Sequence, residues 1–258
     1  MSVDGGRDTE TSNFDLPQAH GCSMQLNDMT MTRRALLGGV AVTALCLALP
    51  LGVTDAMAQE QPPEPAGDVD MAEALKPGSL PEMALGDEKA KVTIIEYMSM
   101  TCPHCAHFHN TSFDEIKTKY VDTGKARFIL REFPFDPVAT AAFMLARCNP
   151  QDPKTLATPA QYFPMVSMLF KQQRAWASPQ DGNVRGALLQ TVKLAGYSQE
   201  SFEACLTNQK LLDDVNAVVK RATSEFGVNS TPTFLINGKK YSGDMSVDAM
   251  SKIIDGLL

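Results

Sequence analysis

The chain has 258 residues, of which 44% are hydrophobic and 21% are charged, an ordinary composition for a globular protein with a core. Acidic residues outnumber Lys and Arg by 30 to 23, the formal charge is −7, and there is no long basic run. No nucleic-acid partner is therefore expected, because contacts with phosphates need clustered Lys and Arg.

The beginning of the chain has the pattern of an export signal. Arg33 and Arg34 precede an apolar run over 35–53, and the sequence Ala-Met-Ala that ends at residue 58 is a small-residue cleavage site. We predict an N-terminal extension and a cleaved signal peptide over 1–58, and hence a periplasmic protein. The arginine pair fits either a twin-arginine signal or an ordinary basic region, and the apolar run is also long enough for a marginal membrane span.

Residues 59–85 are predicted to form a flexible leader, because the stretch begins as QEQPPEPAGDVD, which is rich in proline and acidic. A strand–helix–strand pattern follows. The β-branched stretch 91–98 predicts a strand, Pro103 begins a helix with an apolar face through Tyr120, and 126–133 predicts a second strand.

A long helical block comes next, over residues 138–226. Apolar residues recur at spacings of three and four in four segments, 138–148, 161–177, 183–196 and 198–227. After the block, strand 231–236 leads through Asn237-Gly238 into a hairpin, and Ser246 caps a last helix.

The order of these pieces predicts an α/β fold with an all-helical domain inserted between its two halves. We assign 86–137 to the first half, 138–226 to the insertion and 227–258 to the second half. Neither outer piece has enough strands to be stable alone, so one interrupted fold explains the order best.

The stretch MSMTCPHCAHFHN places the pair Cys102 and Cys105 where the first strand ends and the helix begins. At this end of a helix, unpaired N–H groups and the helix dipole stabilise a thiolate, and His104 adds a donor or a positive charge. The pattern predicts a nucleophilic Cys102 of low pKa and a shielded Cys105 that acts as the resolving thiol.

A stretch this rich in Cys and His could also serve two other chemistries. Haem attachment needs a histidine directly after the second cysteine, where this chain has Ala106. A metal site could use both cysteines with His107 and His109, but zinc sites usually take a second ligand pair from a distant segment. We therefore expect no metal and no cofactor, and we expect the two histidines to lie on a solvated helix face.

The segment from Glu96 to Cys105, EYMSMTCPHC, resembles the active-site segment of the DsbA family of bacterial disulfide oxidoreductases. The stretches 131–134, REFP, and 227–234, GVNSTPTF, strengthen the resemblance, which covers about 86–258. The resemblance implies a thioredoxin fold with an inserted helical domain and the activity of a protein-disulfide oxidoreductase.

The resemblance also implies roles for single residues. Pro103 and His104 belong to the catalytic motif, and Glu96 matches a buried acid that exchanges a proton with the resolving cysteine. Pro232 matches a cis-proline, beside which the backbone of Thr231 binds an extended substrate. Enteric DsbA has Val before this proline, whereas isomerase-like relatives have Thr.

Removal of the signal would leave four cysteines. Two belong to the motif, so by elimination we predict a structural disulfide between Cys148 and Cys205.

These observations predict a monomeric periplasmic oxidase. It would donate the Cys102–Cys105 disulfide to reduced exported proteins and be reoxidised by a membrane quinone-linked oxidase. The alternatives are an isomerase or reductase on the same fold, or a metal-binding module. Isomerases of this kind need an N-terminal dimerisation domain, for which 59–85 is too short.

Overall fold

The computed structural model describes residues 61–258, and the predicted signal at 1–58 lies outside this range. Its centre is a six-stranded sheet in the order β1-β6-β5-β3-β4-β2, in which only β3 and β4 pair in parallel. The strands are β1 (Gly67–Asp68), β2 (Met83–Leu85), β3 (Val92–Met98), β4 (Ala126–Glu132), β5 (Thr233–Ile236) and β6 (Lys239–Ser242). Within 61–258 no helix is long and apolar enough to cross a membrane.

Strand β3 lies in the middle of the sheet and is buried on both faces. Its side chains alternate, so Ile94 and Met98 enter one apolar layer while Ile95 and Tyr97 enter the other. By the same alternation Glu96 lies on the face of Ile94 and Met98, and it is completely buried there. A carboxylate in this position needs a partner, which the site described below provides.

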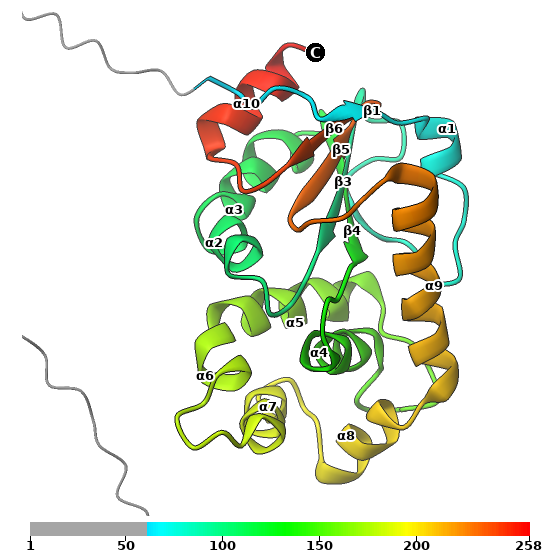
Figure 1. Cartoon of the computed structure of the whole chain (residues 1–258), viewed down its shortest axis with the longest axis vertical. Helices are drawn as coiled ribbons and strands as arrows, with labels where there is room; N and C mark the ends of the chain where they lie inside the picture. The colour runs from blue at the N-terminus through cyan, green and yellow to red at the C-terminus, as the bar shows by residue number, and fades with distance from the viewer. Residues whose placement is uncertain (1–60) are drawn as a thin grey trace, which may run out of the picture. The chain divides into compact units, whose positions relative to one another are not determined.

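Helices cover both faces of the sheet (Figure 1). The first face packs against α2 (Pro103–Thr111), α3 (Phe113–Ile116), the π-helical turn η1 (Lys117–Val121) and α10 (Val247–Asp255). The second face packs against α1 (Met71–Ala74) and the C-terminal half of α9 (Gln209–Phe226).

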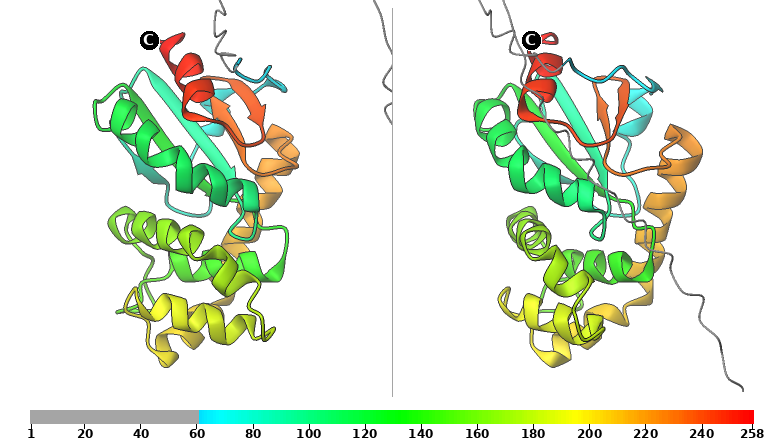
Figure 2. Two further views of the ribbon diagram at one scale, coloured as in Figure 1. Left: turned by 90° about the vertical axis from the view of Figure 1, so that its left-hand side faces the viewer. Right: turned by 60° about the vertical axis from the view of Figure 1, so that its left-hand side comes forward.

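The remaining helices form the inserted domain, which lies beyond the carboxyl ends of β3 and β4 (Figure 2). Its helices are α4 (Pro137–Arg147), α5 (Pro159–Lys171), α6 (Gln173–Ala177), α7 (Val184–Lys193) and α8 (Gln199–Leu206), together with the first half of α9. The fold class predicted from the sequence is confirmed.

A disulfide closes the inserted domain. Cys148, directly after α4, is bonded to Cys205 in α8; their Cα atoms are 5.8 Å apart, and the two residues are 57 positions apart in sequence. The Tyr197 hydroxyl donates to the carbonyl oxygens of Leu145 and Cys148, so the end of α4 is held by a hydrogen bond as well as by the disulfide. The predicted pairing of these two cysteines is present.

The predicted flexible leader over 59–85 is wrong for most of its length. Strand β1 pairs with β6, where Gly67 opposes Lys240, and β2 pairs with β4, where Ala84 opposes Ile129. Strands of two and three residues are too short to show a hydrophobic period, which is why the sequence pattern did not reveal them.

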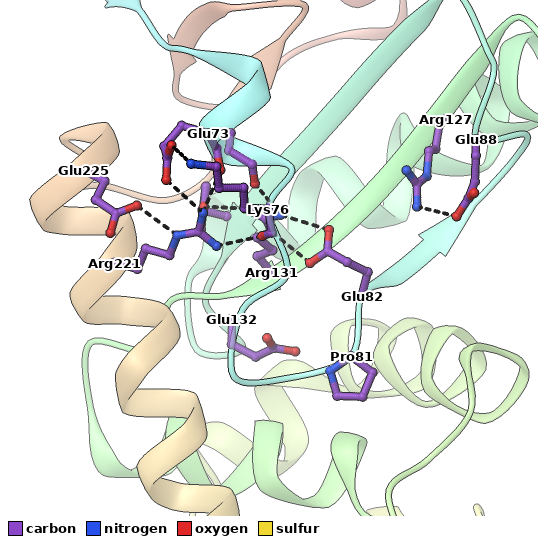
Figure 3. A network of polar contacts seen from close by, with 12 residues as sticks. Glu73, Lys76, Pro81, Glu82, Glu88, Arg127, Arg131, Glu132, Arg221 and Glu225 are labelled. Carbon is purple, nitrogen blue, oxygen red and sulfur yellow. Dashed lines mark hydrogen bonds and ion pairs between the residues drawn. The ribbon is translucent and has the colours of Figure 1, made fainter.

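Ion pairs and hydrogen bonds hold this segment against the sheet and α9 (Figure 3). The buried guanidinium of Arg131 on β4 donates to the Glu82 carboxylate at 2.9 Å and to the Ala74 carbonyl at 2.8 Å. Arg221 on α9 donates to the carbonyl oxygens of Glu73 and Lys76, at 2.6 and 2.8 Å. These contacts make the segment part of the folded unit.

Two boundaries also differ from the prediction. The helix expected from Pro103 to Tyr120 is divided at Ser112, where the Thr111 hydroxyl bonds to the His107 carbonyl one turn earlier, a contact that bends helices. The insertion assigned to 138–226 ends within α9 and not after it, because the C-terminal half of that helix packs on the sheet.

Candidate active site

The two cysteines of the motif lie where β3 gives way to α2, and they differ in exposure. Cys102 is the N-cap residue of α2 and is half-buried, whereas Cys105 is completely buried one turn along the helix. Both are free thiols in this structure. The Cys102 sulfur lies 3.3 Å from the Thr231 carbonyl oxygen, so residues far apart in the sequence meet at this point.

The surroundings of Cys102 favour its thiolate. The pKa of Cys102 is lowered from 9.0 to about 5, first by the hydrogen bond from the Cys105 thiol and then by the Thr231 side chain and the backbone N–H groups of Cys105 and His104. His104 therefore acts through its backbone, while its imidazole is exposed.

The surroundings of Cys105 have the opposite effect. Burial raises the pKa of Cys105 well above its ordinary value, and the thiol's hydrogen bond to Cys102 and the charge of Glu96 raise it further. One thiol of the pair is thus a thiolate at neutral pH while the other keeps its proton.

A loop from the second half of the fold completes the site. The Thr231–Pro232 peptide bond is cis. The Pro232 carbonyl accepts a hydrogen bond from the Gly243 N–H at 2.9 Å, and the Thr233 hydroxyl donates to the Ser230 carbonyl at 2.8 Å. The loop therefore presents the backbone of Thr231 beside the Cys102 sulfur. Pro103, the first residue of α2, is exposed.

Beneath the dithiol lies a buried pair that the sequence did not reveal. His109 Nε2 is 3.0 and 3.2 Å from the two carboxylate oxygens of Glu96. The expectation that His109 lies on a solvated helix face is wrong, because its side chain is only 3% exposed and its ring stacks on Phe170 at 4.5 Å. His107 is exposed as expected and pairs with Asp244.

A buried ion pair lies on the same face of the sheet, nearer the inserted domain. Glu132 on β4 accepts hydrogen bonds from Arg147 at 2.5 and 2.9 Å and from the Tyr162 hydroxyl at 2.7 Å. Since Arg147 and Tyr162 come from α4 and α5, these bonds join the sheet to the inserted domain.

The inserted domain also reaches the active-site loop directly. The Gln173 amide, at the start of α6, donates to the carbonyl oxygens of Met100 and Cys102 at 2.8 and 2.9 Å. On the other side of the loop, the Thr101 hydroxyl donates to the Asp136 carboxylate at 2.6 Å, and the same carboxylate caps α4. Sequence reasoning missed Gln173, because a single glutamine in an amphipathic helix carries no signal.

The metal site considered from the sequence needs Cys102, Cys105, His107 and His109 to converge. In residues 61–258 no group of three or more His, Cys, Asp or Glu side chains is placed to hold a metal ion. The two histidines are instead paired with Asp244 and Glu96.

These features define a thioredoxin-fold protein with a Cys-x-x-Cys dithiol and an inserted helical domain. The chain matches the Thioredoxin family model over residues 79–256. It is 31% identical to the solved structure of Wolbachia pipientis alpha-DsbA1, with a TM-score of 0.63, over 72% of this chain and 94% of that one. The chain belongs to the DsbA family of thiol:disulfide oxidoreductases.

Two further proteins extend the comparison. A protein of Rickettsia conorii that is named a protein-disulfide oxidoreductase is 35% identical over 181 residues, which are 69% of this chain and 60% of that relative. The chain thus spans about three fifths of its length. BdbD from Bacillus subtilis shares the fold, at 19% identity and a TM-score of 0.58, over 74% of this chain and 96% of that one.

Proposed function

We propose that this protein is a periplasmic thiol oxidase, which donates its Cys102–Cys105 disulfide to reduced exported proteins. The observation that carries the proposal is the asymmetry of the dithiol. Cys102 is partly exposed with a pKa of about 5, while Cys105 is buried and keeps its proton. A stabilised thiolate stabilises the reduced protein, and the disulfide is then the stronger oxidant.

The geometry determines which sulfur reacts first. A client thiolate attacks the Cys102 sulfur, because Cys105 is completely buried. The bond between the two cysteine sulfurs breaks, its electron pair passes to Cys105, and a mixed disulfide joins the client to Cys102. The second client thiolate then attacks the client sulfur of that bond. Cys102 leaves as a thiolate, which its low pKa makes a good leaving group.

The Thr231 backbone provides the place for the client chain. Its carbonyl oxygen lies 3.3 Å from the Cys102 sulfur, and an extended peptide that paired with this backbone would bring its own cysteine to Cys102. Such pairing depends on main-chain groups and places few demands on client side chains.

The location and the partners of the protein belong to the same proposal. The export signal predicted over residues 1–58 supports a periplasmic location. Each turnover leaves the dithiol reduced, so the cycle needs an oxidant, which we propose is a membrane quinone-linked oxidase as in the family. We propose that the protein acts as a monomer.

A disulfide isomerase or reductase is the second candidate, and Thr231 is the observation that favours it, since isomerase-like relatives carry Thr before the cis-proline. The two candidates differ in the direction of electron flow. An oxidase takes two electrons from its client, whereas a reductase gives two electrons to it.

The experiment is a single turnover without any other oxidant. Oxidised protein is mixed with an equimolar reduced peptide that contains two cysteines, and free thiols are counted on both. We expect the peptide to gain a disulfide and the protein to gain two thiols, and we expect Cys102→Ser to abolish the transfer. Cys105→Ser, loaded at Cys102 with a labelled thiol, should release the label and form a stable mixed disulfide with a peptide that has a single cysteine, because no second thiol is present to resolve it. A peptide that stays reduced beside oxidised protein would contradict the proposal.

A further inference from the structure

The reaction proposed above creates a demand for a proton inside the protein. When a client thiolate attacks Cys102, the electron pair of the broken bond arrives on the sulfur of Cys105, which is 0% exposed. Burial and neighbouring charges raise the pKa of that thiol well above its ordinary value. A buried thiolate is costly, so a proton must reach the sulfur as the bond breaks.

The negative charge of the Glu96 carboxylate acts on the Cys105 sulfur and disfavours its thiolate. Among residues 61–258 the only hydrogen-bond partner of that carboxylate is His109, which binds both oxygens through Nε2 at 3.0 and 3.2 Å. The two side chains are 0% and 3% exposed. Water therefore does not compete for this contact, and the two groups can share one proton along this hydrogen bond.

His109 is fixed in this position from all sides. It follows Cys105 by four residues in α2, so both lie on the same face of the helix. Its ring lies against Phe170 and Phe113, at 4.5 and 4.8 Å between ring centres, and meets the edge of Phe108 at 5.5 Å. The imidazole cannot turn away from the carboxylate without displacing these rings.

The other ionisable groups around the pair have partners of their own. From β4, Glu132 is paired with Arg147 of α4 and accepts the hydroxyl of Tyr162 from α5. The residues opposite Glu96 on β4 and β5 are uncharged, Leu130 and Phe234. Besides the dithiol itself, His109 is therefore the titratable group that can balance the charge of Glu96.

We propose that Glu96 and His109 form one proton-exchange unit for Cys105, in which His109 is a positioning residue that supplies the shared proton through Glu96. In client oxidation the unit gives its proton to the Cys105 sulfur as the bond to Cys102 breaks, and it regains a proton from solvent. In reoxidation the unit takes the proton from Cys105, whose sulfur then attacks the Cys102 sulfur of the mixed disulfide with the oxidant. This role rests on the proposed dithiol chemistry, but it holds for either direction of electron flow.

The test isolates the step at Cys105. The protein is loaded at Cys102 with a chromogenic aromatic thiol as a mixed disulfide, and release of the dye reports the attack by Cys105. The rate is followed against pH for the wild type, Glu96→Gln, His109→Gln and the double variant. His107→Gln is the matched control, because His107 lies on the same helix but is exposed to solvent and pairs with Asp244.

We expect His109→Gln and Glu96→Gln each to slow the release about tenfold or more at pH 7 and to remove the same inflection from the pH profile. The double variant should be no slower than the slower single variant, because the two residues act as one unit. His107→Gln should match the wild type. A His109→Gln profile that coincides with the wild-type profile, beside a slow Glu96→Gln, would overturn the role of His109.

A measurement on the unaltered protein keeps the proposal testable if a variant does not fold. The ring nitrogen signals of His109 and His107 are recorded by NMR in the oxidised and reduced protein. The signals of His109 should differ between the two states, because His109 is coupled to the dithiol through Glu96, while those of His107 should coincide. Coinciding His109 signals in both states would overturn the proposal. The direction of electron flow is read from the peptide experiment above, so failure of the oxidase proposal and failure of this proposal are distinguishable.

Discussion

Replacement of Thr231 by Val should raise the pKa of Cys102 and weaken the disulfide as an oxidant. The Thr231 side chain is one of the groups that lower this pKa to about 5. Val has nearly the same shape but no hydroxyl, so it removes a donor from the thiolate and leaves the backbone in place. Thr231→Ser keeps the hydroxyl and is the matched control.

The magnitude follows from the value of a hydrogen bond to a charged group, about 1.5–3 kcal/mol. Because Cys102 is only half-buried, we discount this to about 1.4 kcal/mol, which corresponds to about one pKa unit. The pKa should then rise to about 6, still below neutral pH. Almost the whole loss falls on the reduced protein, so the reduction potential should drop by about 30 mV.

Two assays check this prediction. The ultraviolet absorbance of the thiolate, followed against pH, gives the pKa of Cys102, and equilibrium with glutathione gives the potential. Thr231→Ser should keep both values close to those of the wild type. If Thr231→Val leaves the pKa unchanged, the hydroxyl does not stabilise the thiolate and the reasoning is refuted.

The stability of the reduced protein should depend on pH through Cys102, whose pKa in the folded state, about 5, lies below its ordinary value of 9.0. This stabilisation is complete above pH 9 and is lost as the pH falls towards 5. The free energy of unfolding of the reduced protein, relative to that of the oxidised protein, should therefore fall by about 1 kcal/mol or more between pH 7 and pH 5, after discounting for exposure. Urea unfolding of both forms measures this difference, and a difference that stays constant would contradict the low pKa. Gln173→Leu should destabilise the protein by about 2 kcal/mol, because two carbonyl oxygens of the active-site loop lose a donor. Gln173→Glu, which also lacks the donor, should be no more stable, and a neutral Gln173→Leu would show that water replaces the amide. Removal of the disulfide by Cys148→Ala with Cys205→Ala should lower the free energy of unfolding by about 4 kcal/mol, because the disulfide closes a loop of 57 positions. The pKa of Cys102 should stay unchanged, because the disulfide lies within the inserted domain, and a shifted thiolate titration in that variant would contradict this expectation.

The parts of the site that depend on local sequence could be predicted. Cys102 and Cys105 follow a β-branched strand and begin a helix, so their chemistry could be argued from position alone. Thr231 and Pro232 needed the resemblance to a family, because no local pattern places them beside a cysteine 129 positions earlier.

The parts that depend on tertiary packing could not be predicted. The sequence predicts a solvated helix face for His109, whereas its spacing of four from Cys105 places both residues on one face of α2. Gln173 reaches the active-site loop across a boundary between the two parts of the fold. The short strands β1 and β2 exist only because longer strands offer them an edge.

The reduction potential of the Cys102–Cys105 pair tests the central claim most directly. Equilibrium of the purified protein with mixtures of reduced and oxidised glutathione gives it in one titration. A disulfide donor should have a value near that of DsbA, about −120 mV, because the Cys102 thiolate stabilises the reduced form. A value near that of thioredoxin, about −270 mV, would mean that electrons flow from this protein to its clients, and it would contradict the proposal of an oxidase.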